Sequence, residues 1–436
     1  MDVISVLVTL GVIMILGFIG NYIFNRTQIP SIVWLLLFGL IVGSIIRSQG
    51  IININNEYLL NAFSEFFAAI AIIIILFDGG INTDLYQLFK GAPRGLILTI
   101  TGFCLSLLAT ILIIVGLASV GILPISIENS LAVGAILGAI IGGTSSPIVI
   151  PLASKLKNLQ EKTKVVLSIE SIITDPLAIV VVLAGIYMIL VAKSPDFTLG
   201  IKSLVSTFSI GIVIGVALGF VWLPIMHKVK KEQFSYVLTL AVVFLVYCLT
   251  AALVGIDEGG TGAGAISCLM FGLVLGNGKK ILKMVKYEGA GFEIDRQTKE
   301  FHSLTSFLIR TFFFVYLGIM VSFKNAGFIL IGIIVLLALL ALRYLAVQIT
   351  TFRGGFEKDD KQTMMVIMPR GLAAAILAIS FGQRIVGPEG MNLGEIMNGF
   401  FEDISFVVIL GTAIVTTVGV SLISYYEGKK TKKSEI

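Results

Sequence analysis

Charged residues are scarce in this chain. Only 13% of its 436 residues are Asp, Glu, Lys or Arg, whereas 57% are hydrophobic, and the mean hydropathy is +1.02. A soluble protein of this size needs far more polar surface to face water. The composition therefore excludes a soluble fold, and its repeated long apolar stretches predict an all-α polytopic membrane protein.

Residues that bind metals or carry redox chemistry are also few. The chain has two histidines and three cysteines, without the spacing of a metal or redox motif. No Walker A or HExxH sequence, channel filter or arginine-rich voltage sensor is present. We therefore expect neither an enzyme nor a bound cofactor.

Thirteen apolar stretches are long enough to be membrane spans, and the loops between them are short. This predicts a single transmembrane domain over residues 1–426, followed by a charged cytoplasmic tail, 427–436, that we expect to be unstructured. The predicted spans are 3–24, 31–47, 58–81, 94–122, 131–154, 163–192, 198–224, 234–254, 261–276, 303–323, 326–352, 363–384 and 402–426.

Lysine and arginine gather in alternate loops. Most of the 31 basic residues follow odd-numbered spans or lie in the tail, whereas the opposite loops hold only Arg47, Lys193, Lys202, Lys324 and Arg384. Because basic loops favour the cytoplasm, we expect the N-terminus outside the cell membrane and the C-terminus inside.

Two carboxylates lie in the sixth apolar stretch. Ser171 and Asp175 are four residues apart and share one stripe of a helix, while Glu170 and Thr174 share the next. Pro176 leaves a nearby backbone carbonyl without its usual donor. An ionisable residue at bilayer depth is costly, so this group predicts a site for a small hard cation; the alternative is a buried structural ion pair.

Two spans contain residues that break helices. The fifth carries Gly142–Pro147 and the twelfth carries Met368–Gly371, each with an internal proline. Paired broken helices in corresponding places of two halves indicate a transporter site. Dividing the spans as six, one and six makes the fifth correspond to the twelfth, with opposite orientations, and so predicts an inverted repeat.

A further acid and three arginines lie within predicted spans. Asp78 is either a second acidic ligand or gate, or a helix-end residue that reaches water. Arg310, Arg343 and Arg370 stay charged and each needs a partner, so we assign them structural roles. Glu170 is the natural partner of one of them, with Arg343 or Arg370 favoured over Arg310.

Several of these segments together resemble the monovalent cation:proton antiporters, in particular the archaeal and bacterial NhaP-type branch related to animal sodium/proton exchangers. Glu170–Asp175 is similar to the family pattern Glu-Ser-x-x-Asn-Asp, and Phe77–Gly80 to Phe-Glu-Gly-Gly. Gly143–Pro147 stands where Ala-Thr-Asp-Pro is usual. Arg310–Phe313 and Pro369–Gly371 look like the family's arginine motifs.

The resemblance implies a site and an assembly. Asp175 would be the carboxylate that binds either the ion or the proton, with Ser171 as a ligand. Asp78 takes the place of a second acidic ligand, and Thr144 is placed at the site, so Na⁺ would lie among these four residues. Glu170 would be the structural acid that pairs with an arginine. The family is homodimeric, with a core domain that moves against a dimerisation domain.

The chain departs from the family pattern in two places. Thr174, which we include among the ion-site residues, stands where Asn is usual, and Ser145 or Ser146 replaces the acid of the fifth span. The first change leaves the preference among Na⁺, Li⁺ and K⁺ open. The second removes an acid from the place where the broken helices cross.

The predicted mechanism is competition at one carboxylate. Burial disfavours a bare charge, so Asp175 would hold either a proton or a cation, and alternating access would exchange one for the other. One cation for one proton makes the exchange electroneutral. The alternatives are K⁺/H⁺ exchange, a cation-coupled solute symporter of the same architecture, a cation channel and a sensor that has lost transport.

Overall fold

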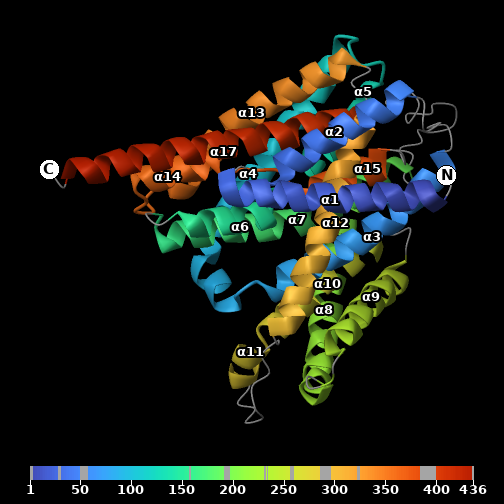
Figure 1. Cartoon of the computed structure of the whole chain (residues 1–436), viewed down its shortest axis with the longest axis vertical. Helices are drawn as coiled ribbons and strands as arrows, with labels where there is room; N and C mark the ends of the chain where they lie inside the picture. The colour runs from blue at the N-terminus through green and yellow to red at the C-terminus, as the bar shows by residue number, and fades with distance from the viewer. Residues whose placement is uncertain are drawn as a thin grey trace.

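The computed structural model of the chain is helical throughout the part that it describes, without a β-strand there (Figure 1). That part comprises residues 3–27, 31–49, 57–156, 159–190, 197–229, 232, 234–255, 260–284, 296–321, 325–382 and 399–434. The helices are α1 (Val3–Thr27), α2 (Ser31–Gln49), α3 (Glu57–Ile81), α4 (Leu85–Ser119), α5 (Ile127–Ile140), α6 (Ser146–Lys155), α7 (Glu161–Leu190), α8 (Phe197–Val229), α9 (Ser235–Val254), α10 (Gly260–Gly276), α11 (Gly278–Met284), α12 (Arg296–Met320), α13 (Ala326–Thr351), α14 (Lys358–Val366), α15 (Leu372–Gly382) and α17 (Phe400–Ser434).

Each of the thirteen predicted spans coincides with a helix or with a pair of helices. The fifth span is divided into α5 and α6, and the twelfth into α14 and α15, as the glycine and proline positions predict. Within the described residues, seven helices are long and apolar enough to cross a membrane, and five more are shorter apolar helices. The predicted all-α transporter architecture is therefore confirmed.

Several helix boundaries differ from the sequence prediction, and two differ most. Helix α4 begins at Leu85, before Pro93, rather than at residue 94. Helix α17 continues to Ser434, so the expectation of an unstructured tail after Tyr426 is wrong for most of that segment. Adding residues to an existing helix avoids the cost of nucleation, which explains how a polar segment can continue a long apolar helix.

The helices form two groups. The core bundle contains α4–α7, α13–α15 and α17; in it α4 packs on α5, α7 and α13, while α17 packs on α13 and α15. The panel bundle contains α1–α3, α8–α10 and α12; in it α10 packs on α3, α8 and α9, while α12 packs on α1 and α2. The core bundle thus brings together spans four to six and spans eleven to thirteen. It therefore contains both broken spans, the fifth and the twelfth, which the predicted repeat relates to each other.

The short helix α10 packs unusually closely on α3. A Cβ atom at Gly80 would overlap the carbonyl oxygen of Leu269, and one at Gly276 would overlap that of Ile81. Small residues let two membrane helices approach until their backbones touch. This close packing explains why a 17-residue, glycine-rich segment is a stable part of the panel bundle.

We expect Gly80→Ala to destabilise the protein by about 1–3 kcal/mol, because the added methyl group must push the α10 backbone away. Thermal unfolding of the purified protein in detergent measures this change. Gly116→Ala is the matched control, since Gly116 lies in α4 and a methyl group there would meet no atom within 4 Å. Equal melting temperatures for the two variants would contradict the close packing of α3 and α10.

Candidate ion-binding site

The two broken helices cross inside the core bundle. The first break separates the end of α5 at Ile140 from the start of α6 at Ser146, and the second separates α14 from α15. At the crossing, the backbone N–H of Ser145 donates to the carbonyl oxygen of Pro369 over 2.9 Å. Gly371 lies against Ser145 so closely that any side chain there would overlap it. The breaks therefore satisfy some of each other's free backbone groups.

Arg370 occupies the crossing itself. Its Nη1 donates to the carbonyl oxygen of Gly142 over 2.7 Å, and its backbone N–H donates to Oγ1 of Thr412 over 3.0 Å. The side chain is buried, with 4% of its surface exposed. The guanidinium thus lies at the carboxyl end of α5, where the helix dipole favours a positive charge. This contact takes the place of an acidic partner at the crossing.

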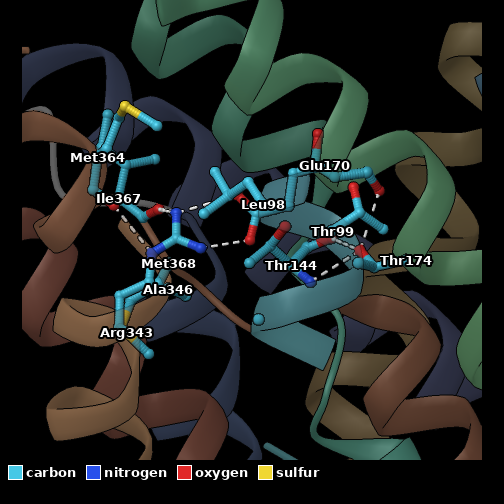
Figure 2. A network of polar contacts seen from close by, with 12 residues as sticks. Leu98, Thr99, Thr144, Glu170, Thr174, Arg343, Ala346, Met364, Ile367 and Met368 are labelled. Carbon is cyan, nitrogen blue, oxygen red and sulfur yellow. Dashed lines mark hydrogen bonds and ion pairs between the residues drawn. The ribbon is translucent and has the colours of Figure 1, made fainter. Parts of the chain in front are cut away.

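Glu170 and Arg343 form a buried ion pair between α7 and α13 (Figure 2). Both oxygens of the carboxylate accept from the guanidinium, which is the strong bidentate geometry. Arg343 also donates from Nε to the carbonyl oxygen of Met364 over 2.9 Å, and from Nη2 to that of Ile367 over 3.0 Å. The pair therefore fixes the end of α14 beside α7, and it shows which arginine meets Glu170.

Thr174 holds the first break in place. Its hydroxyl oxygen accepts from the backbone N–H of Thr144 over 3.0 Å and lies 3.3 Å from the carbonyl oxygen of the same residue (Figure 2). A side chain on α7 thus satisfies the unwound backbone of the fifth span. Two of the three backbone contacts of the hydroxyl are made with the break, and the third is with the carbonyl oxygen of Ser171 on α7, so Thr174 ties Thr144 to α7.

Asp175 lies on the neighbouring face of α7 and is buried, with 7% of its surface exposed. Ser146, at the start of α6, donates from its hydroxyl to Oδ2 of Asp175 over 3.4 Å. Among the described residues, no basic side chain forms an ion pair with this carboxylate. Asp175 is thus a buried acid without an ion-pair partner in the described part of the chain.

Two other hydroxyl groups lie on the segments that carry or contact this part of α7. The buried hydroxyl of Thr144 makes no hydrogen bond with the described residues. Ser171, one turn before Asp175, donates to the carbonyl oxygen of Ser168 over 3.0 Å and keeps its own oxygen as an acceptor. Carboxylate and hydroxyl oxygens are the ligands that hard cations prefer. The sequence had not singled out Ser146 as a ligand, although its place at the first turn of a broken helix was a usable signal.

Asp78 lies in a different part of the structure, in α3 of the panel bundle. Asn82 donates from Nδ2 to Oδ1 of Asp78 over 3.0 Å, and the charge of Arg310 on α12 lies within electrostatic range. No hydrogen bond or ion pair between described residues joins Asp78 to Asp175. Its role as a second acidic ligand remains a prediction.

The chain matches known transporters along nearly its whole length. The family model described as "Sodium/hydrogen exchanger, transmembrane" matches residues 11–425. The chain belongs to the sodium/hydrogen exchanger family. It is a multi-pass membrane protein that exchanges a cation for protons, and the family is one of transporters rather than enzymes.

Individual relatives agree with this membership. The Na(+)/H(+) antiporter 1 of Methanocaldococcus jannaschii is 25% identical over 425 residues, which cover 95% of this chain and 91% of that protein. The K(+)/H(+) antiporter NhaP of Alkalimonas amylolytica is 23% identical over 381 residues, which cover 86% of this chain and 60% of that protein. The solved structure of the sodium proton antiporter from M. jannaschii at pH 8 has the same fold, with a TM-score of 0.79, 24% identity, and 96% of this chain and 100% of that chain covered.

We expect Glu170→Gln to destabilise the protein by about 3–5 kcal/mol, because it leaves the charge of Arg343 buried without its partner. Thermal unfolding in detergent measures the loss. The control is Glu161→Gln at the exposed start of the same helix, where Glu161 pairs with Lys164 and its side chain is 84% exposed. An exposed pair contributes little, so this variant should unfold within about 0.5 kcal/mol of the original protein. Equal effects of the two changes would contradict the structural role of the Glu170–Arg343 pair.

Proposed function

We propose that this antiporter exchanges one Na⁺ for one H⁺ and that Asp175 binds both in turn. The observation that carries the proposal is a buried carboxylate that accepts a hydrogen bond from Ser146 at a broken helix, with no basic partner among the described residues. Such a carboxylate is stable when it binds a proton or a cation, and not when it is bare. Ser171, Thr144 and Ser146 supply the further oxygen ligands.

The charges at the crossing support an electroneutral cycle. Glu170 cancels the charge of Arg343, which leaves Arg370 and Asp175 as charged groups that hydrogen-bond to the first broken span. A bound proton and a bound monovalent cation each add one positive charge to this set. Both loaded forms therefore have the same net charge, and Thr174 adds no second carboxylate.

Two observations bear on the choice of ion. The similar antiporter of M. jannaschii is named for Na⁺, whereas that of A. amylolytica is named for K⁺. The hydroxyl of Thr174 contacts the backbone of Thr144 and is therefore occupied. The ligands of the ion would then be Asp175 and the other hydroxyl groups. We assign Na⁺ as the substrate and retain K⁺ as the second candidate.

The arrangement in the cell is part of the same proposal. The distribution of lysine and arginine supports a cell-membrane protein with its N-terminus outside and its C-terminus in the cytoplasm. The family resemblance supports a homodimer in which the core bundle moves against the panel bundle. Asp78 and Arg310, on the panel bundle, would then line the path to the site.

Proteoliposomes with an imposed pH gradient test the exchange. We expect Na⁺ to dissipate the gradient equally with the membrane voltage clamped or free, and Asp175→Asn to abolish this effect because the amide neither binds a cation nor releases a proton. Glu161→Gln, an equivalent change at an exposed position of the same helix, should leave it intact.

Each other outcome has a distinct meaning. If K⁺ alone dissipates the pH gradient, then K⁺ and not Na⁺ is the substrate. If the dissipation depends on the membrane voltage, one-for-one exchange is overturned. Cation-dependent exchange that persists in a folded Asp175→Asn variant would refute the site assignment.

Competition at one carboxylate also predicts the pH dependence. When protons occupy most of the sites, the apparent KM for the cation should rise about tenfold for each unit that the pH falls, since ten times more protons compete. Saturating cation should restore the maximal rate. Initial rates measured over a range of cation concentrations at several pH values check this, and a pH-independent KM with a falling maximal rate would indicate separate sites.

A further inference from the structure

A second buried acid lies far from Asp175 along the chain, in the first turn of α17. Glu402 is 6% exposed and therefore almost wholly enclosed by protein. Among the described residues, no basic side chain forms an ion pair with it. The sequence analysis did not select this residue, because it lies at the edge of a predicted span, where an acid usually reaches water.

An unsatisfied hydroxyl is found on α12, a helix that contacts α17. Tyr316, on α12, is 8% exposed, and its hydroxyl makes no hydrogen bond within the described part of the chain. The Glu402 carboxyl group lies within electrostatic range of that hydroxyl. Tyrosine hydroxyls usually find a partner when they are buried, so this one marks a place for a missing ligand.

Ser405 adds a third oxygen atom. It follows Glu402 by three residues, which places the two side chains on the same side of α17. Ser405 is fully buried, and its hydroxyl also lacks a hydrogen bond among the described residues. A buried hydroxyl without a hydrogen bond is unfavourable, and a polar ligand would satisfy both of these groups.

The chemistry of these three groups favours a positively charged ligand. All of them offer oxygen, and the carboxylate supplies the negative charge that a hard cation requires. Asp403, the next residue in α17, is also buried and adds a second acid nearby. A neutral organic solute would find these acids and two hydroxyls, and no basic side chain paired with Glu402 within the described part of the chain to orient it.

The place of the group in the fold connects it with transport. Tyr316 belongs to the panel bundle, whereas Glu402 and Ser405 belong to the core bundle, and α12 contacts α17. The group lies where α12 approaches its end and α17 begins, at the face that the lysine and arginine distribution assigns to the outside. A movement between the bundles would therefore open or close it.

From these observations we infer that Glu402, Tyr316 and Ser405 form a second binding site for the transported monovalent cation, at the outer end of the contact between the two bundles. The inference rests on the exchange proposed above and on its orientation. The site binds a cation that enters or leaves on the outer side, before or after Asp175 holds it.

Transport measured separately from each face tests this site, with the full-length protein in right-side-out and inverted membrane vesicles. Glu402→Gln should raise the KM for Na⁺ at the outer face by about five- to tenfold, the effect of losing one charged ligand. It should leave the KM at the cytoplasmic face within about twofold, since Asp175 is untouched. K⁺ replaces Na⁺ in this experiment if K⁺ is the ion that dissipates the pH gradient.

Two further variants keep the test decisive. Tyr316→Phe removes only the hydroxyl and should raise the outer KM by about two- to threefold, so it serves if Glu402→Gln does not fold. Glu128→Gln removes an exposed acid at the start of α5 on the same outer face and should change neither KM. This control distinguishes the loss of a cation ligand from the loss of one negative charge on the outer surface.

The outcomes distinguish this inference from the proposed function. An unchanged outer KM in folded Glu402→Gln and Tyr316→Phe, with normal exchange by the original protein, overturns the second site alone. An equal rise at both faces overturns it as well, because a structural role has no preferred side. Absence of exchange in the original protein overturns the proposed function, and the second site with it.

Discussion

The buried ion pair between Glu170 and Arg343 is the contact on which the core bundle depends. It joins α7 of the first half of the chain to α13 of the second, and Arg343 also binds the last carbonyl groups around the end of α14. Broken helices leave backbone groups that lipid cannot satisfy, so their ends must bind to protein. Arg343 does this for the twelfth span and Thr174 does it for the fifth, which fixes both breaks relative to α7.

Once the breaks are fixed, Asp175 is left with a distinct environment. Its neighbour Glu170 pairs with an arginine, whereas Asp175 accepts a hydrogen bond from Ser146 and forms no ion pair in the described structure. Two acids five residues apart on one helix thus have different surroundings: one is paired and joins two helices of the bundle, and the other is the acid that we propose exchanges ligands. Arg370, bound to the carbonyl oxygen of Gly142, supplies a fixed positive charge at the crossing without occupying the carboxylate.

The second acidic group, Glu402 with Tyr316, lies at the contact between the two bundles. Transport by alternating access needs a contact surface that changes while each bundle keeps its internal packing. The close approach of α3 and α10 stabilises the panel bundle from within, and the Glu170–Arg343 pair does the same for the core bundle. Glu402 and Tyr316 lie on opposite sides of the surface between them, so a cation there would be sensitive to the movement.

The sequence by itself determined the membrane class, the thirteen spans, the two breaks and the presence of costly carboxylates in the sixth span, because these follow from local composition and from the energy of placing charge in a bilayer. It did not determine which arginine meets Glu170, since Arg343 and Arg370 are both plausible until α13 and α14 are placed. It also missed Ser146, Glu402 and Tyr316 and the helical extension to Ser434. Only the tertiary structure decided these, because each depends on which helix packs against which, and no local pattern records that choice.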